Sequence, residues 1–202
     1  TGSTSGALDG QAHSGSQDVF LVKYDSSGTK QWTRQLGTSS FDEGNGITSD
    51  SAGNVYITGH TFGALDGQTH NGDSDVFLVK YDSSGTKQWT RQLGTSSSDA
   101  GNGITANASG HLYVTGYTSS GLDGQMYSGD NDIFVVKCDS NGTKRWTRQL
   151  GTSVQDRGYS VTSDSNNNVY VTGHTKGALD GQSHSGDQDM FIIKYSANGT
   201  KR

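Results

Sequence analysis

A unit of 57 residues recurs four times along this chain of 202 residues, in register and without an insertion. The dipeptide Thr-Gly, for example, begins at Thr1, Thr58, Thr115 and Thr172. The stretch from Asp18 to Ser40 is identical, residue for residue, to the stretch from Asp75 to Ser97. Self-similarity at a fixed period predicts a repeat architecture before any local pattern is considered. A feature present in every copy therefore belongs first to the scaffold and only second to function.

Composition narrows the class of protein. Only 29% of the residues are hydrophobic, while the chain has 30 Gly and no Pro, so we expect short apolar strands joined by many tight turns. The net charge of -5 and the absence of a basic cluster argue against a nucleic-acid partner. No apolar run reaches the length of a membrane span. The single cysteine, Cys138, stands where other units carry Tyr, so we interpret it as a half-buried substitute.

Each unit contains four segments with the patterns of β-strands. The run 76–81 is β-branched and aromatic, and 87–93 alternates between apolar and polar residues. The segment 101–106 is small and Gly-rich, and 112–115 closes the set. No stretch has a period of 3.6 residues, so helices should be nearly absent.

Four short strands per unit predict a β-propeller blade, with the Gly-rich strand innermost and the Trp-containing strand outermost. The repeat frame predicts complete blades at 41–97 and 98–154 and partial blades at 1–40 and 155–202. The first partial blade should lack its innermost strand and the last its outermost. Further repeats or a second chain would then be needed to close a ring. An open β-solenoid of the same repeats is the alternative fold.

At residues 50–59 and 75–95 the chain resembles the bacterial β-propeller repeat family known as SBBP. The resemblance covers the whole chain. It implies a propeller fold and a secreted or cell-surface location. It implies no particular reaction, because the family is defined by its repeat.

Acidic residues are concentrated in the loop between the second and third strands of each unit. Their oxygens could bind Ca²⁺, which takes six to eight oxygen ligands from flexible loops. The alternative is that these aspartates cap turns by accepting backbone hydrogen bonds. The candidate ligands are Asp66, Asp73, Asp75, Asp123, Asp130, Asp132, Asp180, Asp187 and Asp189.

Aromatic residues offer a second kind of candidate site. His60, Tyr117 and His174 share one unit position, where exchange between His and Tyr favours a packing or ligand-stacking role over metal ligation. Tyr56 and Tyr113 are further candidates for stacking against a sugar. The position of Glu43 also varies between units, which we attribute to drift on a tolerant loop.

Catalysis has little support, because nearly identical units provide no single special place for a nucleophile and its base. We therefore expect a non-catalytic structural or adhesive module that meets protein or glycan partners at a cell surface. The alternative is a multivalent carbohydrate-binding or Ca²⁺-binding propeller with one weak site per blade. No cofactor other than Ca²⁺ is expected.

Overall fold

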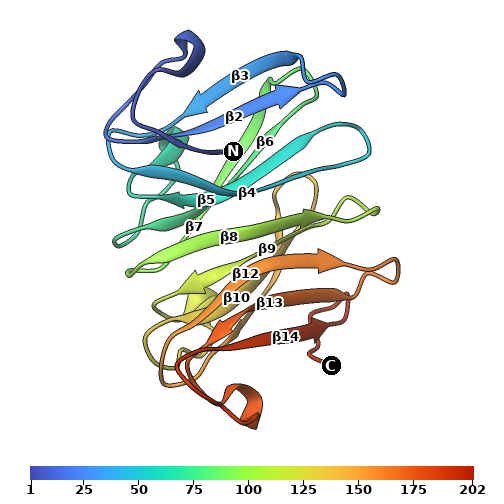
Figure 1. The fold of residues 1–202 in the computed structure, drawn as a ribbon. Helices are drawn as coiled ribbons and strands as arrows, with labels where there is room; N and C mark the ends of the chain where they lie inside the picture. The colour runs from blue at the N-terminus through green and yellow to red at the C-terminus, as the bar shows by residue number, and fades with distance from the viewer.

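The computed structural model describes all 202 residues, and it confirms an all-β repeat array (Figure 1). Its strands form four antiparallel sheets, two of four strands and two of three. The first sheet holds β1 (Gly2–Thr4), β2 (Asp18–Tyr24) and β3 (Lys30–Leu36). The second holds β4 (Asp42–Ser49), β5 (Val55–Thr61), β6 (Asp75–Tyr81) and β7 (Lys87–Leu93). The third holds β8 (Asp99–Ala106), β9 (Leu112–Thr118), β10 (Asp132–Cys138) and β11 (Lys144–Leu150). The fourth holds β12 (Asp156–Ser163), β13 (Val169–Thr175) and β14 (Asp189–Tyr195).

Sequence neighbours pair within every sheet, so each four-stranded sheet is a meander of the blade type. The only helical segments are four 3₁₀ turns, one in each loop between the second and third strands of a unit. They are η1 (Leu8–Gly10), η2 (Leu65–Gly67), η3 (Leu122–Gly124) and η4 (Leu179–Gly181). None of these turns is long enough to cross a membrane.

The sheets follow one another in chain order, and the first and last sheets lie at opposite ends of the molecule (Figure 1). No ring is closed. The structure therefore shows an open array, which is compatible with part of a propeller or with a solenoid of the same units.

The Gly-rich strands β4, β8 and β12 are neighbours along the array, as expected for the crowded inner edge of the blades. The Asn45 side chain donates to the carbonyl of Gly101 at 3.1 Å, and Asn102 repeats this contact with Gly158 at 2.8 Å. A Cβ at Gly116 would lie 1.8 Å from the backbone oxygen of the adjacent strand. Glycine at that position therefore permits the close approach of two backbones.

The hydrophobic core is divided into three clusters, one at each junction between consecutive sheets. Each cluster combines the side chains on the rear face of one sheet with those on the front face of the next. The central cluster, for example, joins Val76 and Leu78 of β6 to Phe134 and Val136 of β10. Burial of apolar area between units, not within one unit, therefore stabilises the array.

An arginine of the outer strand donates to the turn of the next sheet at each junction, and a tryptophan does so at the first and third. Arg34 of β3 donates through Nε to the Gly85 carbonyl at 2.5 Å, and Trp32 donates to Ser83 at 3.3 Å. Both acceptors lie in the turn between β6 and β7 of the next sheet. Trp32 therefore packs between neighbouring sheets at this junction.

The two end faces of the array have no neighbouring sheet. Ile192 of β14 is 70% exposed, whereas its unit equivalents Leu78 and Val135 are 5% and 1% exposed. At the other end, Tyr24 of β2 is 58% exposed and its equivalent Tyr81 is 3% exposed. The same unit positions are thus core residues inside the array and surface residues at its ends.

Candidate functional site

Many of the residues that change chemical character between units lie at one edge of the array, which we call the variable edge. It comprises the beginning of each inner strand and the end of the strand that pairs with it. In the second sheet its members are Phe41, Glu43, Asn45, His60 and Phe62. In the third they are Ser98, Ala100, Asn102, Tyr117 and Ser119, and in the fourth Gln155, Arg157, Tyr159, His174 and Lys176. Backbone pairing brings them together, since position 43 lies opposite 60, 100 opposite 117 and 157 opposite 174.

The second sheet presents an acidic and aromatic version of this edge. The rings of Phe41 and His60 stack at 5.7 Å, and Phe62 packs edge-on against Phe41 at 5.8 Å. Glu43 Oε2 lies 3.9 Å from His60 Nε2. Burial lowers the pKa of His60, although the charges of Glu43 and Asp42 act in the opposite direction.

The fourth sheet presents a basic version. The Arg157 guanidinium lies 4.3 Å from the ring centre of Tyr117, which belongs to the preceding sheet. The ring of Tyr159 lies 5.3 Å from that of His174. Burial lowers the pKa of His174, and the charges of Arg157 and Lys176 lower it further. Basic and aromatic groups thus meet at the junction of the third and fourth sheets.

Of the aromatic residues predicted for ligand stacking, His60, Tyr117 and His174 all lie on the variable edge and are partly exposed. The prediction for Tyr56 and Tyr113 is wrong, because these side chains are 1% and 0% exposed. Their rings are covered by the following sheet, which is a contact that the sequence of a single unit does not reveal.

The aspartates predicted as Ca²⁺ ligands separate into three groups with different partners. The first group lies in the 3₁₀ turns and clamps the outer strand of its own sheet. Asp66 accepts hydrogen bonds from Lys87 at 2.5 Å and from Thr90. Its φ of 50° is left-handed, and these contacts hold the backbone in that conformation. Asp123 bonds Lys144 and Thr147 in the same way, and Asp180 bonds Lys201.

The second group begins the third strand of each sheet and is more deeply buried. Asp75 Oδ2 accepts from the Asn71 backbone at 2.9 Å and from Gln92 at 2.8 Å. Asp132 repeats this arrangement with Ser128 and Gln149, and burial raises its pKa. Asp189 accepts from the Ser185 backbone at 2.8 Å. The Oδ1 atoms of Asp75 and Asp132 are buried and have no hydrogen-bond partner.

The third group, Asp73, Asp130 and Asp187, is exposed at the loop surface. The three aspartates of one loop therefore point to different surroundings, and the structure contains no group of three or more His, Cys, Asp or Glu side chains that could hold a metal. Turn capping and strand clamping account for most of the contacts that these residues make.

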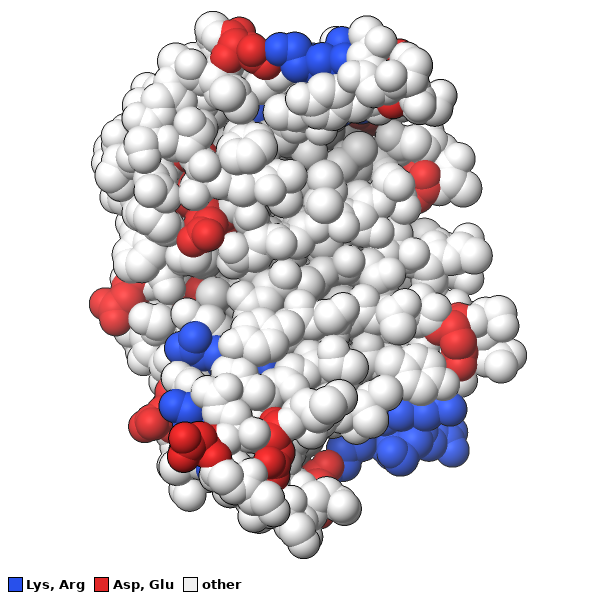
Figure 2. Space-filling view, in the orientation of Figure 1, with Lys and Arg blue, Asp and Glu red and all other residues white.

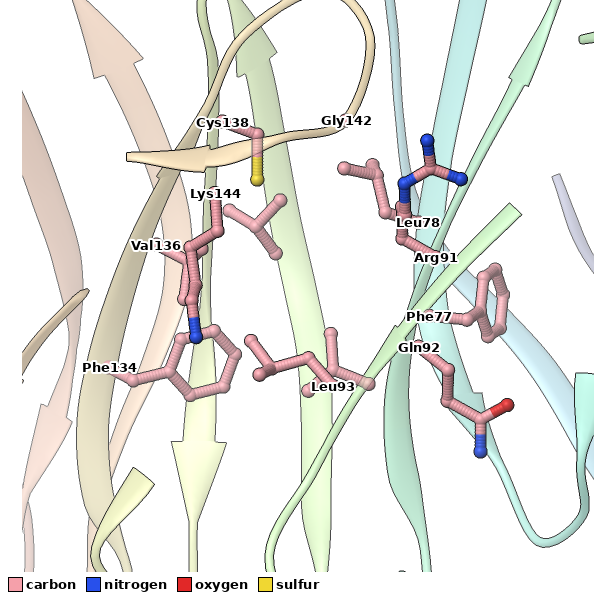
Figure 3. A pocket seen from close by; sticks show the side chains of 12 residues that line it. Phe77, Leu78, Arg91, Gln92, Leu93, Phe134, Val136, Cys138, Gly142 and Lys144 are labelled. Atoms are coloured by element: carbon pink, nitrogen blue, oxygen red, sulfur yellow. The ribbon is translucent and has the colours of Figure 1, made fainter. Parts of the chain in front are cut away.

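A cavity of 180 Å³ lies between the second and third sheets (Figure 3). Its lining is mostly apolar and includes Leu78, Leu93, Phe134 and Val136, with the Cys138 sulfur pointing into it. Burial raises the pKa of Cys138 to about 12, so its thiol stays protonated and unreactive. Cys138 stands at the unit position of Tyr81 and Tyr195, which have larger side chains, and we interpret the cavity as a packing defect, not a ligand site.

Sequence reasoning missed Phe41, Arg157 and Tyr159 as members of the candidate site. The available signal was their departure from an otherwise strict repeat. We noted this departure for Glu43 from the sequence but attributed it to drift. Only the pairing of the inner strand with its neighbour shows that the departures share one edge.

Comparison with known proteins agrees with the repeat. A family model described as "Beta-propeller repeat" (SBBP) matches residues 31–65, 88–123 and 145–179. "Regulatory protein FlaEY" of Caulobacter vibrioides is 32% identical over 164 residues, which are 74% of this chain and 17% of that protein. "Uncharacterized WD repeat-containing protein L264" of Acanthamoeba polyphaga mimivirus is 24% identical over 187 residues, 72% of this chain and 13% of that protein. The chain thus spans less than a fifth of either relative. A protein of unknown function from Bacteroides caccae, 10% identical, aligns with a TM-score of 0.32 over 87% of this chain and 70% of its own.

Proposed function

Because the chain belongs to the SBBP β-propeller repeat family, we propose that it is a non-catalytic binding module of a secreted or cell-surface protein. One observation carries this proposal. Many of the unit-to-unit differences in chemical character gather at the variable edge, while the residues of the junctions stay mostly apolar in every unit. A repeat protein that binds partners needs this division between a constant scaffold and a changeable surface.

The ligands of such a surface are glycans or proteins. The edge offers aromatic rings, an acidic group in the second sheet and basic groups in the fourth. Aromatic and arginine side chains are the residue types that contribute most at binding surfaces. Several weak contacts along one array would give avidity without a single strong site.

The test compares the wild-type protein with a levelled variant on a glycan and protein array. The levelled variant gives the second and fourth sheets the residues of the third. Its substitutions are Phe41→Ser, Glu43→Ala, His60→Tyr, Phe62→Ser, Gln155→Ser, Arg157→Ala, Tyr159→Asn, His174→Tyr and Lys176→Ser. A matched control, Arg145→Gln, removes an exposed charge from the outer strand by introducing the residue that other units carry there.

We expect the wild type and the control to bind the same array features and the levelled variant to lose them. Equal melting temperatures for the three proteins would show that folding is unaffected. Binding that survives in the levelled variant would refute a role for the variable edge.

A second candidate function is Ca²⁺ binding by the acidic loops. It is favoured by the buried, unpartnered Oδ1 atoms of Asp75 and Asp132. A ligand that binds only the native state raises the melting temperature. Melting in millimolar Ca²⁺ and in chelator tests the idea, and identical midpoints would refute it.

We further propose that the exposed end faces bind sheets of the same repeat, supplied by further units or by a second chain. The three internal junctions support this, because each buries the same rear-face and front-face positions that Ile192 and Tyr24 expose at the ends. Head-to-tail contacts of this kind build rings or filaments. Sedimentation should reveal concentration-dependent association that Ile192→Asp abolishes, and a strict monomer at high concentration would refute self-association.

A further inference from the structure

Arg157 differs from the other arginines of the four sheets in that its guanidinium donates no hydrogen bond. Arg34 and Arg148 donate to carbonyls of the next turn, Arg91 does likewise, and Arg145 pairs with a carboxylate. Arg157 Nε is buried and has no partner. Its charge also has no carboxylate within ion-pair distance in the structure, so its hydrogen-bonding capacity is unused.

The surroundings hold this guanidinium in place and keep its neighbourhood positive. Tyr117 covers one face of it at 4.3 Å, which is the distance of a close cation–π contact. His174 lies directly opposite Arg157 in the strand pair, and its Nε2 is buried without a partner. Lys176 is exposed nearby and makes no ion pair, while its backbone N–H bonds Gln155 at 3.0 Å.

Asp156, which precedes Arg157 in the sequence, forms no ion pair with it. It is fully buried, and its Oδ2 accepts hydrogen bonds from the backbone and the hydroxyl of Thr152 at 2.5 and 2.9 Å. In the second sheet the position of Arg157 is occupied by Glu43, which lies 3.9 Å from a histidine. The basic group is therefore particular to the fourth sheet.

We propose that Arg157 and Tyr159 bind an acidic saccharide, with Arg157 holding the carboxylate or sulfate and Tyr159 packing against the sugar ring. This inference rests on the proposed binding function and assigns its ligand class. A guanidinium presents paired N–H groups that match the two oxygens of such an acid group. Because the guanidinium is already stacked on Tyr117, little side-chain freedom is lost on binding.

Tyr159 supplies the reason for preferring a saccharide to another anion. Its side chain is 49% exposed, and it stands beside His174 at a ring distance of 5.3 Å. A flat, exposed aromatic ring next to an anion-binding group suits a ligand with an apolar ring face and an acid group. The equivalent residues Asn45 and Asn102 instead bond the next inner strand and provide no such ring.

The experiment titrates the full chain with tetragalacturonate and follows backbone and arginine Nε signals by NMR. Maltotetraose serves as the neutral saccharide and a tetraglutamate peptide as the acidic non-saccharide. The variants are Arg157→Ala, Arg157→Lys and Tyr159→Asn, the last of which introduces the residue of the other units. Arg145→Gln is the matched loss of charge elsewhere.

We expect wild-type protein to bind tetragalacturonate with a dissociation constant on the order of 1 mM, as befits one shallow site. Arg157→Ala should weaken binding at least about tenfold, and Arg157→Lys should recover it only partly, because the paired donors are lost. Tyr159→Asn should weaken the binding of tetragalacturonate but leave the binding of tetraglutamate unchanged. Binding should also weaken with added salt, while Arg145→Gln behaves as wild type.

Three results would overturn the inference. The first is the absence of shifts around Arg157 in wild-type protein. The second is an equal loss in Arg145→Gln, which would indicate a non-specific charge effect. The third is tetraglutamate binding as tightly as the saccharide with no effect of Tyr159→Asn, which would assign the site to acidic peptides. If array ligands depend on the second sheet instead, this inference fails while the proposed function stands.

Discussion

Replacing Cys138 with tyrosine should stabilise the protein, because the cysteine leaves a cavity that its unit equivalents fill. Tyr81 and Tyr195 are each 3% exposed at the matching positions of the other two junctions. The charged neighbours also match. The charges of Asp66 and Arg34 influence the pKa of Tyr81, and those of their unit equivalents Asp123 and Arg91 influence the pKa of Cys138. The chain itself thus shows that a tyrosine fits these surroundings.

The size of the effect follows from the cavity. A sealed cavity of 180 Å³ would carry a penalty of about 4 kcal/mol at about 24 cal/mol per Å³, and this one is partly open to solvent, so its penalty is well below that value. A phenol ring fills part of this space and loses side-chain freedom, so we expect a gain of about 1–2 kcal/mol in the free energy of unfolding.

The same junction lacks contacts that the others have, which gives a second readout. Trp32 and Trp146 donate through Nε1 to the next turn at 3.3 and 3.2 Å, whereas Trp89 Nε1 is buried without a partner. Closer packing in Cys138→Tyr should restore this hydrogen bond. The Trp89 indole proton should then exchange with solvent more slowly.

Urea unfolding of Cys138→Tyr, Cys138→Ala and the reciprocal Tyr81→Cys measures the effect. The reciprocal change should cost about 2–4 kcal/mol, because it removes a buried aromatic ring and leaves a void in its place. If Cys138→Tyr is neutral or destabilising while its m-value matches wild type, the cavity is not a packing defect and the reasoning fails.

Three further predictions, which use four substitutions, test other parts of the structure. Leu78→Ala should cost about 2–4 kcal/mol in urea unfolding, and Ile192→Ala less than about 1 kcal/mol at low protein concentration, since only the first is buried; equal losses would contradict the account of the end faces. Gly116→Ala places a Cβ 1.8 Å from a backbone oxygen, so it should lower the melting temperature sharply, and a normal melt would contradict the strand contact. Hydrogen bonds, first from Ser84, lower the pKa of Asp82 below its ordinary value of 3.8. The ionised Asp82 therefore stabilises the folded protein at neutral pH, and this contribution is lost as the pH falls through the lowered pKa. The stability difference between wild type and Asp82→Ala should therefore shrink in acid, and a constant difference would show that the charge is irrelevant.

The period, the four strands of each unit and the inner place of the Gly-rich strand could be predicted from sequence, because each has a local pattern. Tyr56 illustrates the limit. Its burial is decided by the following sheet, so its pattern within one unit looked compatible with a surface platform. Arg157 illustrates a second limit of prediction from sequence, because its stacking on Tyr117 crosses a junction between units.

The site was therefore only partly predictable. His60, Tyr117 and His174 were found by their shared position, but their grouping with Phe41 and Arg157 depends on strand pairing. The acidic loops show a different case: their composition left Ca²⁺ binding and turn capping open, and the structure shows the carboxylates of Asp66 and Asp75 accepting hydrogen bonds from Lys, Thr, Gln and backbone donors.

The repetition of the junctions also bears on how such an array could change length over evolutionary time. Lys23 donates to Ser83 and Lys137 donates to Ala197, so the same donor meets the same turn position at the first and third junctions. Recombination between nearly identical coding segments would add or remove one whole unit. Every remaining junction would then still consist of the rear face of one sheet and the front face of the next. A deletion of any other length would separate donors from acceptors and expose half of a core. The architecture thus favours growth and shrinkage in whole steps, each giving a foldable descendant with a different set of variable-edge residues.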